Sequence, residues 1–237
     1  MNKICKLSAI ALLASSTSLM AQSKGFEGAS LGVSLSAIGV EASGNTKSGT
    51  NSDSSTGSIG KIAEIASLDL AYTIALGSNS AIALGATYTP GKAKAGSGTY
   101  NDASDTASAT PAVAGVSGTD GSINVEVKDP YTIYIAPTYV VSKDSALYAK
   151  LGYSKADVNV SATGSAALTK KPNDLEGWTY AIGSKTMLTP NFYIGVEASV
   201  TDYDSITATR ATGSSGTTNV TADVKAVQAS VAIGYKF

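Results

Sequence analysis

Residues that could carry out covalent chemistry are scarce in this sequence. Its 237 residues include no histidine and a single cysteine, Cys5. The segment Gly28-Ala-Ser-Leu-Gly32 matches the G-x-S-x-G pattern of serine hydrolases, which places its serine at a strand-to-helix turn. Here the match lies inside an alternating run, and no imidazole is present to act as its base. General acid–base catalysis by Asp, Glu or Lys stays chemically open, but no spacing points to it, so we predict that the protein is not an enzyme.

The sequence also lacks the signatures of cofactor and metal sites. No Walker A segment, dinucleotide-binding fingerprint or EF-hand loop is present. Without histidine, and with only Cys5, the chain cannot form a thiolate or imidazole metal site. We interpret the acidic residues Asp102, Asp105 and Asp120 as solvated loop charges. No cofactor and no metal are therefore expected.

Four charged residues stand out because each lies on the small, polar face of an alternating run: Asp69, Lys150, Lys185 and Glu197. A lone buried charge costs several kcal/mol, so charges on an inward face should pair or contact trapped water. We predict a polar network inside the fold, with a salt bridge between Lys185 and Glu197. The alternative interpretation of the same four residues is a gated conduction path.

These residues are carried by eight runs in which apolar and polar residues alternate with period two, as in β-strands. About 10 such residues are enough for a tilted strand to cross a bilayer. An even number of strands is typical of bacterial membrane barrels. The eight runs cover residues 30–37, 66–76, 82–89, 131–139, 147–154, 178–185, 192–201 and 227–237.

The last run is the clearest, because it alternates strictly from Val227 to the aromatic Phe237. A closed barrel removes the free sheet edges only if its last strand pairs with its first. We therefore predict that this run pairs with the segment around Leu31–Ala37. No stretch reaches 18 apolar residues, so transmembrane helices are not expected.

The connections between the runs alternate between short and long. Gly77–Ser80, Ser142–Ser145 and Thr189–Asn191 are tight turns of turn-forming residues. Longer polar connections are predicted near Ser43–Ser58, Gly96–Gly121, Gly164–Glu176 and Arg210–Thr218. In an outer-membrane barrel, the short turns face the periplasm and the long loops face outward. The segment 96–121 could also hide a further strand pair, which would give ten strands.

The first residues are typical of a secretory signal peptide. Lys3 and Lys6 precede an apolar run from Leu7 to Ala14, and we predict that the signal covers residues 1–21. The barrel is then expected to cover residues 22–237. Without the two lysines, 15 basic and 18 acidic residues remain, a net charge of about −3 that offers no electrostatic reason for nucleic-acid binding.

Aromatic residues fall mainly on the apolar face of the runs. Tyr and Trp prefer the membrane–water interface, where they form girdles around a barrel. A soluble β-sandwich is the alternative, but its core would need bulky residues where this chain has Ala and Gly. The predicted girdle consists of Tyr72, Tyr88, Tyr131, Tyr139, Trp178, Tyr180 and Phe192.

Taken with these features, the terminal Gly234-Tyr235-Lys236-Phe237 resembles that of the small outer-membrane β-barrel proteins of Gram-negative bacteria, the OmpA-type barrel domain. The resemblance covers the whole segment after the predicted signal, and no peptidoglycan-binding domain is expected after Phe237. It implies that Tyr235 and Phe237 form part of the signal read by the barrel-assembly machinery. The enzymatic barrels of this kind characteristically depend on a histidine, which this chain lacks.

The resemblance implies an all-β, antiparallel up-and-down barrel in the outer membrane. We predict a monomer with a structural or surface-interaction role that displays polar loops; a small porin-like channel for ions or small solutes is the alternative. Its expected partners are outer-membrane lipids, the assembly machinery and periplasmic chaperones. An extracellular ligand of the loops stays open.

Overall fold

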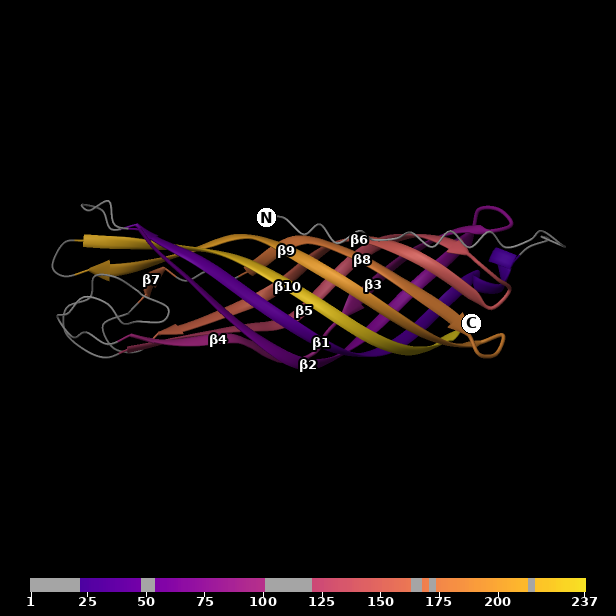
Figure 1. Cartoon of the computed structure of the whole chain (residues 1–237), viewed down its shortest axis with the longest axis horizontal. Helices are drawn as coiled ribbons and strands as arrows, with labels where there is room; N and C mark the ends of the chain where they lie inside the picture. Colours follow the sequence, from indigo (N-terminus) through magenta and orange to yellow (C-terminus); the bar gives the residue numbers. More distant parts are fainter. Residues whose placement is uncertain (1–21, 48–53, 101–120, 163–167, 171–173, 213–215) are drawn as a thin grey trace, which may run out of the picture.

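The computed structural model describes residues 22–47, 54–100, 121–162, 168–170, 174–212 and 216–237. Most of these residues belong to long, tilted strands that wrap around a common axis (Figure 1). No described helix is long and apolar enough to cross a membrane. The elements are η1 (Gln22–Phe26), β1 (Gly28–Lys47), β2 (Ser54–Ala75), β3 (Ser80–Tyr88), β4 (Lys92–Tyr100), β5 (Gly121–Val140), β6 (Ser145–Ala162), β7 (Leu168–Lys170), β8 (Asp174–Met187), β9 (Phe192–Thr212) and β10 (Gly216–Lys236).

The sheet closes on itself as an antiparallel barrel. Its order is β10-β1-β2-β3-β5-β6-β8-β9, and β9 returns to β10. Leu31 lies opposite Tyr235, and the Phe237 N–H donates to the Ala29 carbonyl at 2.9 Å. The predicted pairing of the last run with the first is therefore confirmed. The barrel has eight strands around its wall, because β4 continues the line of β3 along β5 instead of adding a ninth.

Side chains alternate across the wall of this closed part. Outward residues are large and apolar: Leu35 is 71% exposed, Ile182 70% and Val231 59%. Their neighbours on the inward face are small and polar, and Ser36 and Ser67 are buried. A wall with an apolar outer face and hydrogen-bonded strands can face lipid without leaving backbone groups unpaired.

The strands extend well beyond the predicted runs at the end with the long connections. Ser43 pairs with Ser58 and Lys47 with Ser54, although both segments were predicted as loop. Gly216 likewise pairs with Thr212. The loop prediction was wrong here because it followed Ser, Thr and Gly content, whereas a ladder needs only backbone groups and accepts Thr readily. Residues 1–21 and 101–120 lie outside the described residues.

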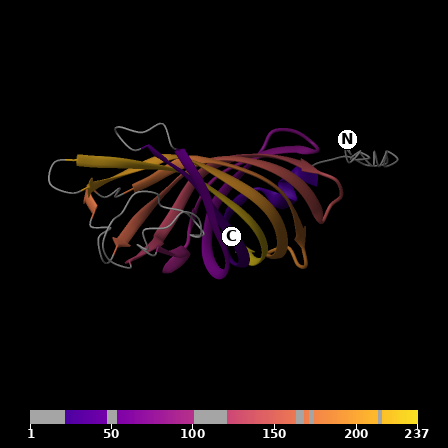
Figure 2. The same ribbon diagram turned by 60° about the vertical axis from the view of Figure 1, so that its left-hand side comes forward.

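Toward this end the barrel wall separates into two sheets. The β2–β3 ladder stops at Leu68 opposite Tyr88, and the β8–β9 ladder stops at Gly177 opposite Tyr203. Beyond these points, β9, β10, β1 and β2 form one sheet, and β4, β5, β6 and β8 form the other. Figure 2 shows the strands spreading apart in this region.

The two sheets enclose an apolar core. One sheet contributes Val40, Val224 and Ala226, with Ile38, Tyr203 and Ile206 packed beside them. The other contributes Val127, Ala156, Val158, Val160 and Leu175. At the end with the long connections, the strands thus form a small β-sandwich. Its two sheets pack face to face, and the side chains between them form the core.

The opposite end is closed by η1. Phe26 is 5% exposed and packs with Val140, Ala146, Met187 and Tyr193. The Ser23 N–H donates to the Ser78 carbonyl at 2.9 Å, which fixes the helix against the turn between β2 and β3. The segment that follows the predicted signal therefore fills the mouth of the barrel at its short-turn end.

We predict that Leu175→Ala destabilises the sandwich. Leu175 is 1% exposed in the apolar core, so its truncation should lower the free energy of unfolding by about 2–5 kcal/mol. The matched control is Leu147→Ala, whose side chain faces outward at 55% exposure and leaves no internal cavity. Urea unfolding of both variants in lipid vesicles measures the difference, and equal losses would contradict the assignment of Leu175 to a packed core.

Candidate functional site

The structure brings the four predicted charged residues together in the middle of the lumen. Asp69 from β2, Lys150 from β6, Lys185 from β8 and Glu197 from β9 all line one cavity of about 90 Å³. Each lies on the inward face of its strand, because alternating positions of a strand point to opposite sides. The structure thus places all four predicted residues on the lumen side of the wall.

Glu197 is the acceptor at the centre of this group. Lys150 Nζ lies 2.7 Å from Glu197 Oε2, and the Tyr148 hydroxyl donates to the same oxygen at 2.9 Å. Only 9% of the Lys150 side chain and 17% of the Glu197 side chain are exposed. Lys150 Nζ also lies 4.2 Å from the centre of the Tyr134 ring, a cation–π contact. The buried ion pair is thus also supported by aromatic side chains.

Asp69 is held by hydroxyl groups instead of by a cation. The Tyr134 hydroxyl lies 3.0 Å and 2.9 Å from its two carboxylate oxygens, and the Thr87 hydroxyl donates to one of them at 2.8 Å. Tyr134 therefore connects the two acidic centres, since its ring contacts Lys150 and its hydroxyl contacts Asp69. The network runs across five strands of the barrel.

The predicted salt bridge between Lys185 and Glu197 is wrong. The ladder places Lys185 opposite Gly195, whereas Glu197 lies opposite Gly183, two residues further along. Glu197 instead forms a salt bridge with Lys150, which comes from β6 on the far side of β8. Lys185 Nζ instead lies 4.3 Å above the Tyr193 ring, and no carboxylate of the described residues lies within salt-bridge distance of it.

Three inward tyrosines were missed by the sequence prediction. Their rings lie over glycines of the neighbouring strands: Tyr134 over Gly85, Tyr148 over Gly183 and Tyr193 over Gly234. A Cβ at any of these positions would collide with the ring, so each tyrosine requires a glycine on the neighbouring strand. These inward glycines do not leave open lumen, because aromatic rings fill the space above them. The signal was present, because the tyrosines occupy the inward positions of their runs.

Between the charged residues and the two-sheet end of the barrel lies a layer of hydroxyl groups. Thr132, Ser154, Thr179 and Thr201 form a chain across four strands, with oxygen–oxygen distances of 2.6, 2.5 and 2.7 Å. Ser67 and Thr89 make a similar contact at 2.6 Å on the other side of the lumen. These groups satisfy one another in a region that is otherwise closed to solvent.

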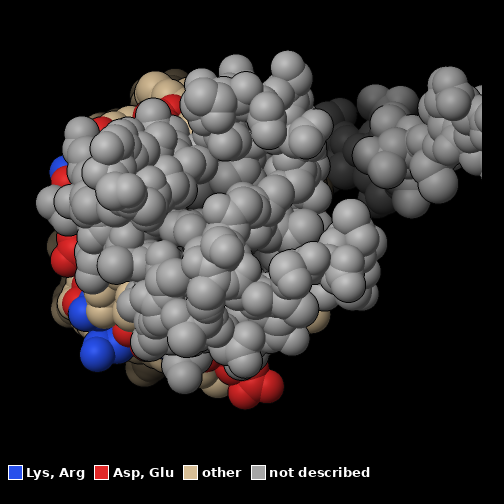
Figure 3. Space-filling view, turned by 90° about the vertical axis from the view of Figure 1, so that its left-hand side faces the viewer, with Lys and Arg blue, Asp and Glu red and all other residues tan. Residues whose placement is uncertain are grey.

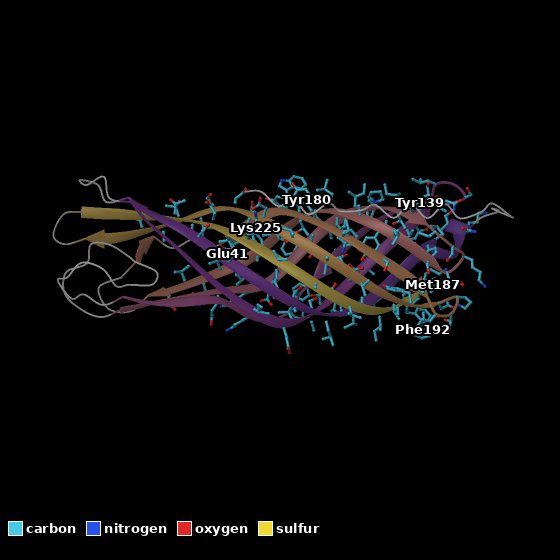
Figure 4. The ribbon with its side chains drawn as sticks, viewed as in Figure 1. Glu41, Tyr139, Tyr180, Met187, Phe192 and Lys225 are labelled. Atoms are coloured by element: carbon cyan, nitrogen blue, oxygen red, sulfur yellow. The ribbon has the colours of Figure 1, made fainter. Side chains whose placement is uncertain are left out.

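The nine aromatic residues predicted for the girdle and for closure all lie on the outer face, between 38% and 71% exposed. Figure 4 shows Tyr139, Tyr180 and Phe192 on the outside of the wall. Phe192, Tyr235 and Phe237 stack edge to face with ring centres 5.0 Å apart. Tyr153 and Trp178 form a similar pair at 5.6 Å.

Beyond the Tyr153–Trp178 pair, the outer surface becomes charged. Lys155 Nζ lies 2.8 Å from Glu176 and 3.7 Å from Asp174. The hydrogen bond from Lys155 holds the pKa of the Glu176 carboxyl below its ordinary value. Figure 3 shows acidic and basic side chains mixed around the rim at this end. Lys155 is thus neutralised locally. No described group of three or more His, Cys, Asp or Glu residues could hold a metal ion.

A closed antiparallel barrel with an apolar outer band and a polar interior defines an integral membrane protein of the outer-membrane β-barrel class. Comparison with known families agrees, since the model of the outer membrane protein beta-barrel domain matches residues 9–237. The chain belongs to this family and resides in the cell outer membrane. No curated protein sequence matches it.

Several solved structures share the fold at low sequence identity. The outer membrane protease OmpT from Escherichia coli and the outer membrane protein OprG from Pseudomonas aeruginosa are each 12% identical, with a TM-score of 0.51. Each match covers 89% of this chain and 97% of the other. Ail, the attachment invasion locus protein of Yersinia pestis, is 15% identical with a TM-score of 0.39, over 89% of this chain and 99% of that one. At such identities the likeness shows the fold alone.

We predict that Lys150→Met destabilises the barrel more than Lys185→Met. The first substitution leaves the buried Glu197 carboxylate without its cation, which typically costs about 3–5 kcal/mol. The second removes only a cation–π contact. The double variant Lys150→Met/Glu197→Gln should recover part of the loss, because it leaves no unpaired charge.

Urea unfolding in lipid vesicles measures all three variants against the unchanged protein. If Lys185→Met proved the more costly substitution, Lys185 rather than Lys150 would be the partner of Glu197.

Proposed function

We propose that this protein is a non-enzymatic outer-membrane barrel with a structural and surface-interaction role. In this view, the barrel is a stable, non-conducting body that presents polar segments at the cell surface. The observation that carries the proposal is that side chains fill the lumen at three successive levels. These levels are the Phe26 cluster at one mouth, the charged network at the centre and the apolar core between the two sheets.

Each level opposes the passage of ions by different means. At the first, Phe26 and Met187 are large and apolar, so water there would find no hydrogen-bonding partners. At the second, three tyrosine rings occupy the space over glycines. At the third, valines and a leucine from both sheets form an apolar core that offers an ion no polar partner. An eight-stranded barrel is in any case only wide enough for its own side chains.

The absence of histidine from the sequence supports a non-enzymatic role, because histidine is the side chain that most often acts as the general base. The name of OmpT describes that protein as a protease, but 12% identity carries over only its fold. We extend the proposal to the membrane partners: the outward aromatics would contact lipid headgroups. Tyr235 and Phe237, at the closing seam, would be read by the assembly machinery.

A porin-like channel is the second candidate, and the cavity beside Lys150 and Lys185 is the observation in its favour. Its volume of about 90 Å³ is enough for water in the polar centre of the lumen. Conduction would require Phe26 and the apolar core to move away from the axis.

The purified protein is expected to show no stable single-channel steps in planar lipid bilayers. Phe26→Ala should also remain closed, because the central network and the apolar core still block the lumen. Stable conductance steps in the unchanged protein, altered in size by Lys185→Ala or Glu197→Ala, would contradict the proposal and favour the porin-like channel.

An epitope inserted within residues 101–120 should bind antibody on intact cells. The same epitope inserted at Ser78, in the short turn beside η1, should bind only after the outer membrane is permeabilised. Flow cytometry of both insertions compares the two ends of the barrel. The reverse labelling pattern would place the long connections in the periplasm and exclude a display role.

A further inference from the structure

We infer that the opening between β2 and β4 leads to a binding site for a small, uncharged, apolar molecule such as a monoaromatic hydrocarbon. The site lies where the closed barrel changes into two sheets. It goes beyond the proposed display role and does not depend on whether the lumen conducts.

The opening exists because of the joint between β3 and β4. Pro90 has no N–H to donate, and Gly91 adopts a φ of +114°, in the region that favours glycine. The Gly91 N–H donates to the Asp129 carboxylate at 2.8 Å, and the Asp129 N–H donates to the Gly91 carbonyl at 2.9 Å. Both bonds hold the joint against β5.

β2 therefore loses its partner on this side. Its ladder to β3 ends at Leu68, and β4 pairs with β5 alone. The Ser67–Thr89 hydroxyl contact marks the lower limit of the opening. Glu64, Ile65 and Ala66 border it on one side, and the segment 89–92 borders it on the other.

Behind the opening lies a cavity of about 270 Å³. Its inner walls are apolar apart from one tyrosine hydroxyl: Ile38, Val40, Val127, Tyr203, Val224 and Ala226. These residues belong to the core of the sandwich, so the cavity is a gap in that core and not a groove on the surface.

The lining determines the chemical class of the ligand. A charged ligand would lose its hydration without gaining a partner inside, because the charged residues Glu64 and Lys92 lie at the exposed mouth. Apolar cavities of roughly 150 Å³ are known to exclude water and bind benzene-sized molecules. A cavity of this size and lining thus suits one small aromatic or short aliphatic molecule.

The position of the mouth indicates how an apolar ligand would reach the cavity. Tyr88 and Tyr131 are register partners at the end of the β2–β3 ladder, and both face outward at 44% and 45% exposure. Below them, the wall beside the opening carries Leu68 and Leu70, which are also exposed. The mouth therefore lies just beyond the lipid-facing wall, at the level where an apolar molecule would leave the outer leaflet.

The test uses the protein in phosphatidylcholine vesicles and the photoreactive monoaromatic 3-trifluoromethyl-3-phenyldiazirine. After irradiation, mass spectrometry maps the labelled residues. We expect label on the lipid-facing Leu70 and Ile133 and also on the cavity residues Val127 and Val224. Excess para-xylene should lower labelling of the two valines by about tenfold relative to the lipid-facing residues, whereas benzoate should not.

Ala226→Phe fills the cavity from within, since Ala226 is 4% exposed in its wall. It should abolish labelling of Val127 and leave Leu70 unchanged. Ala198→Phe, on the outer face of β9, is the control and should label as the unchanged protein does. Heat-modifiable gel mobility verifies that both variants are folded.

Four results would overturn the inference. The first is the absence of label from the cavity residues of the unchanged protein, and the second is label that persists in folded Ala226→Phe. The third is label that para-xylene fails to displace, which would identify a lipid acyl chain as the occupant. The fourth is label that benzoate displaces as well as para-xylene does. The competition arm needs only the unchanged protein, so it decides the question even where Ala226→Phe fails to fold.

Discussion

The structure depends on one constraint: within the hydrocarbon of a membrane, every backbone N–H and C=O must find its partner inside the protein. The ladder between β10 and β1 meets this constraint, because it joins the two edges that an open sheet would leave exposed. Once the sheet is closed, the alternation of side chains places Leu35 and Val231 in contact with lipid and the serines inside. The polar interior is thus a consequence of closure.

The constraint ends where the membrane ends, and the fold changes at that level. The β2–β3 and β8–β9 ladders stop, bulges occur in β5 at Asp129 and in β9 near Asp204, and two sheets separate. The distribution of apolar residues is then reversed. Valines and Leu175 lie between the sheets, whereas Glu41 and Lys225 face outward. The same strands therefore place apolar side chains outward where they face lipid and inward where they face water.

This reversal explains how far the sequence could be interpreted. Period-two alternation located all eight strands of the closed part and placed the four charged residues inside. Beyond that part it failed for two reasons. The Ser, Thr and Gly content was interpreted as loop. In β5, a bulge also shifts the inward face by one residue, so that Tyr134 is inward at an even position but Val127 at an odd one. It also failed for Lys185, since pairing across three strands depends on side-chain reach and not on position within one hairpin.

The same geometry limits where a ligand could be held. In the closed part, tyrosine rings over Gly85, Gly183 and Gly234 leave a small polar cavity beside the charges. Eight strands cannot enclose more than this without expelling the network that satisfies Glu197 and Asp69. The wall widens only where two ladders end, and there the lining is apolar. A binding function of the barrel body, as distinct from its surface segments, therefore belongs at the level of Pro90 and Gly91.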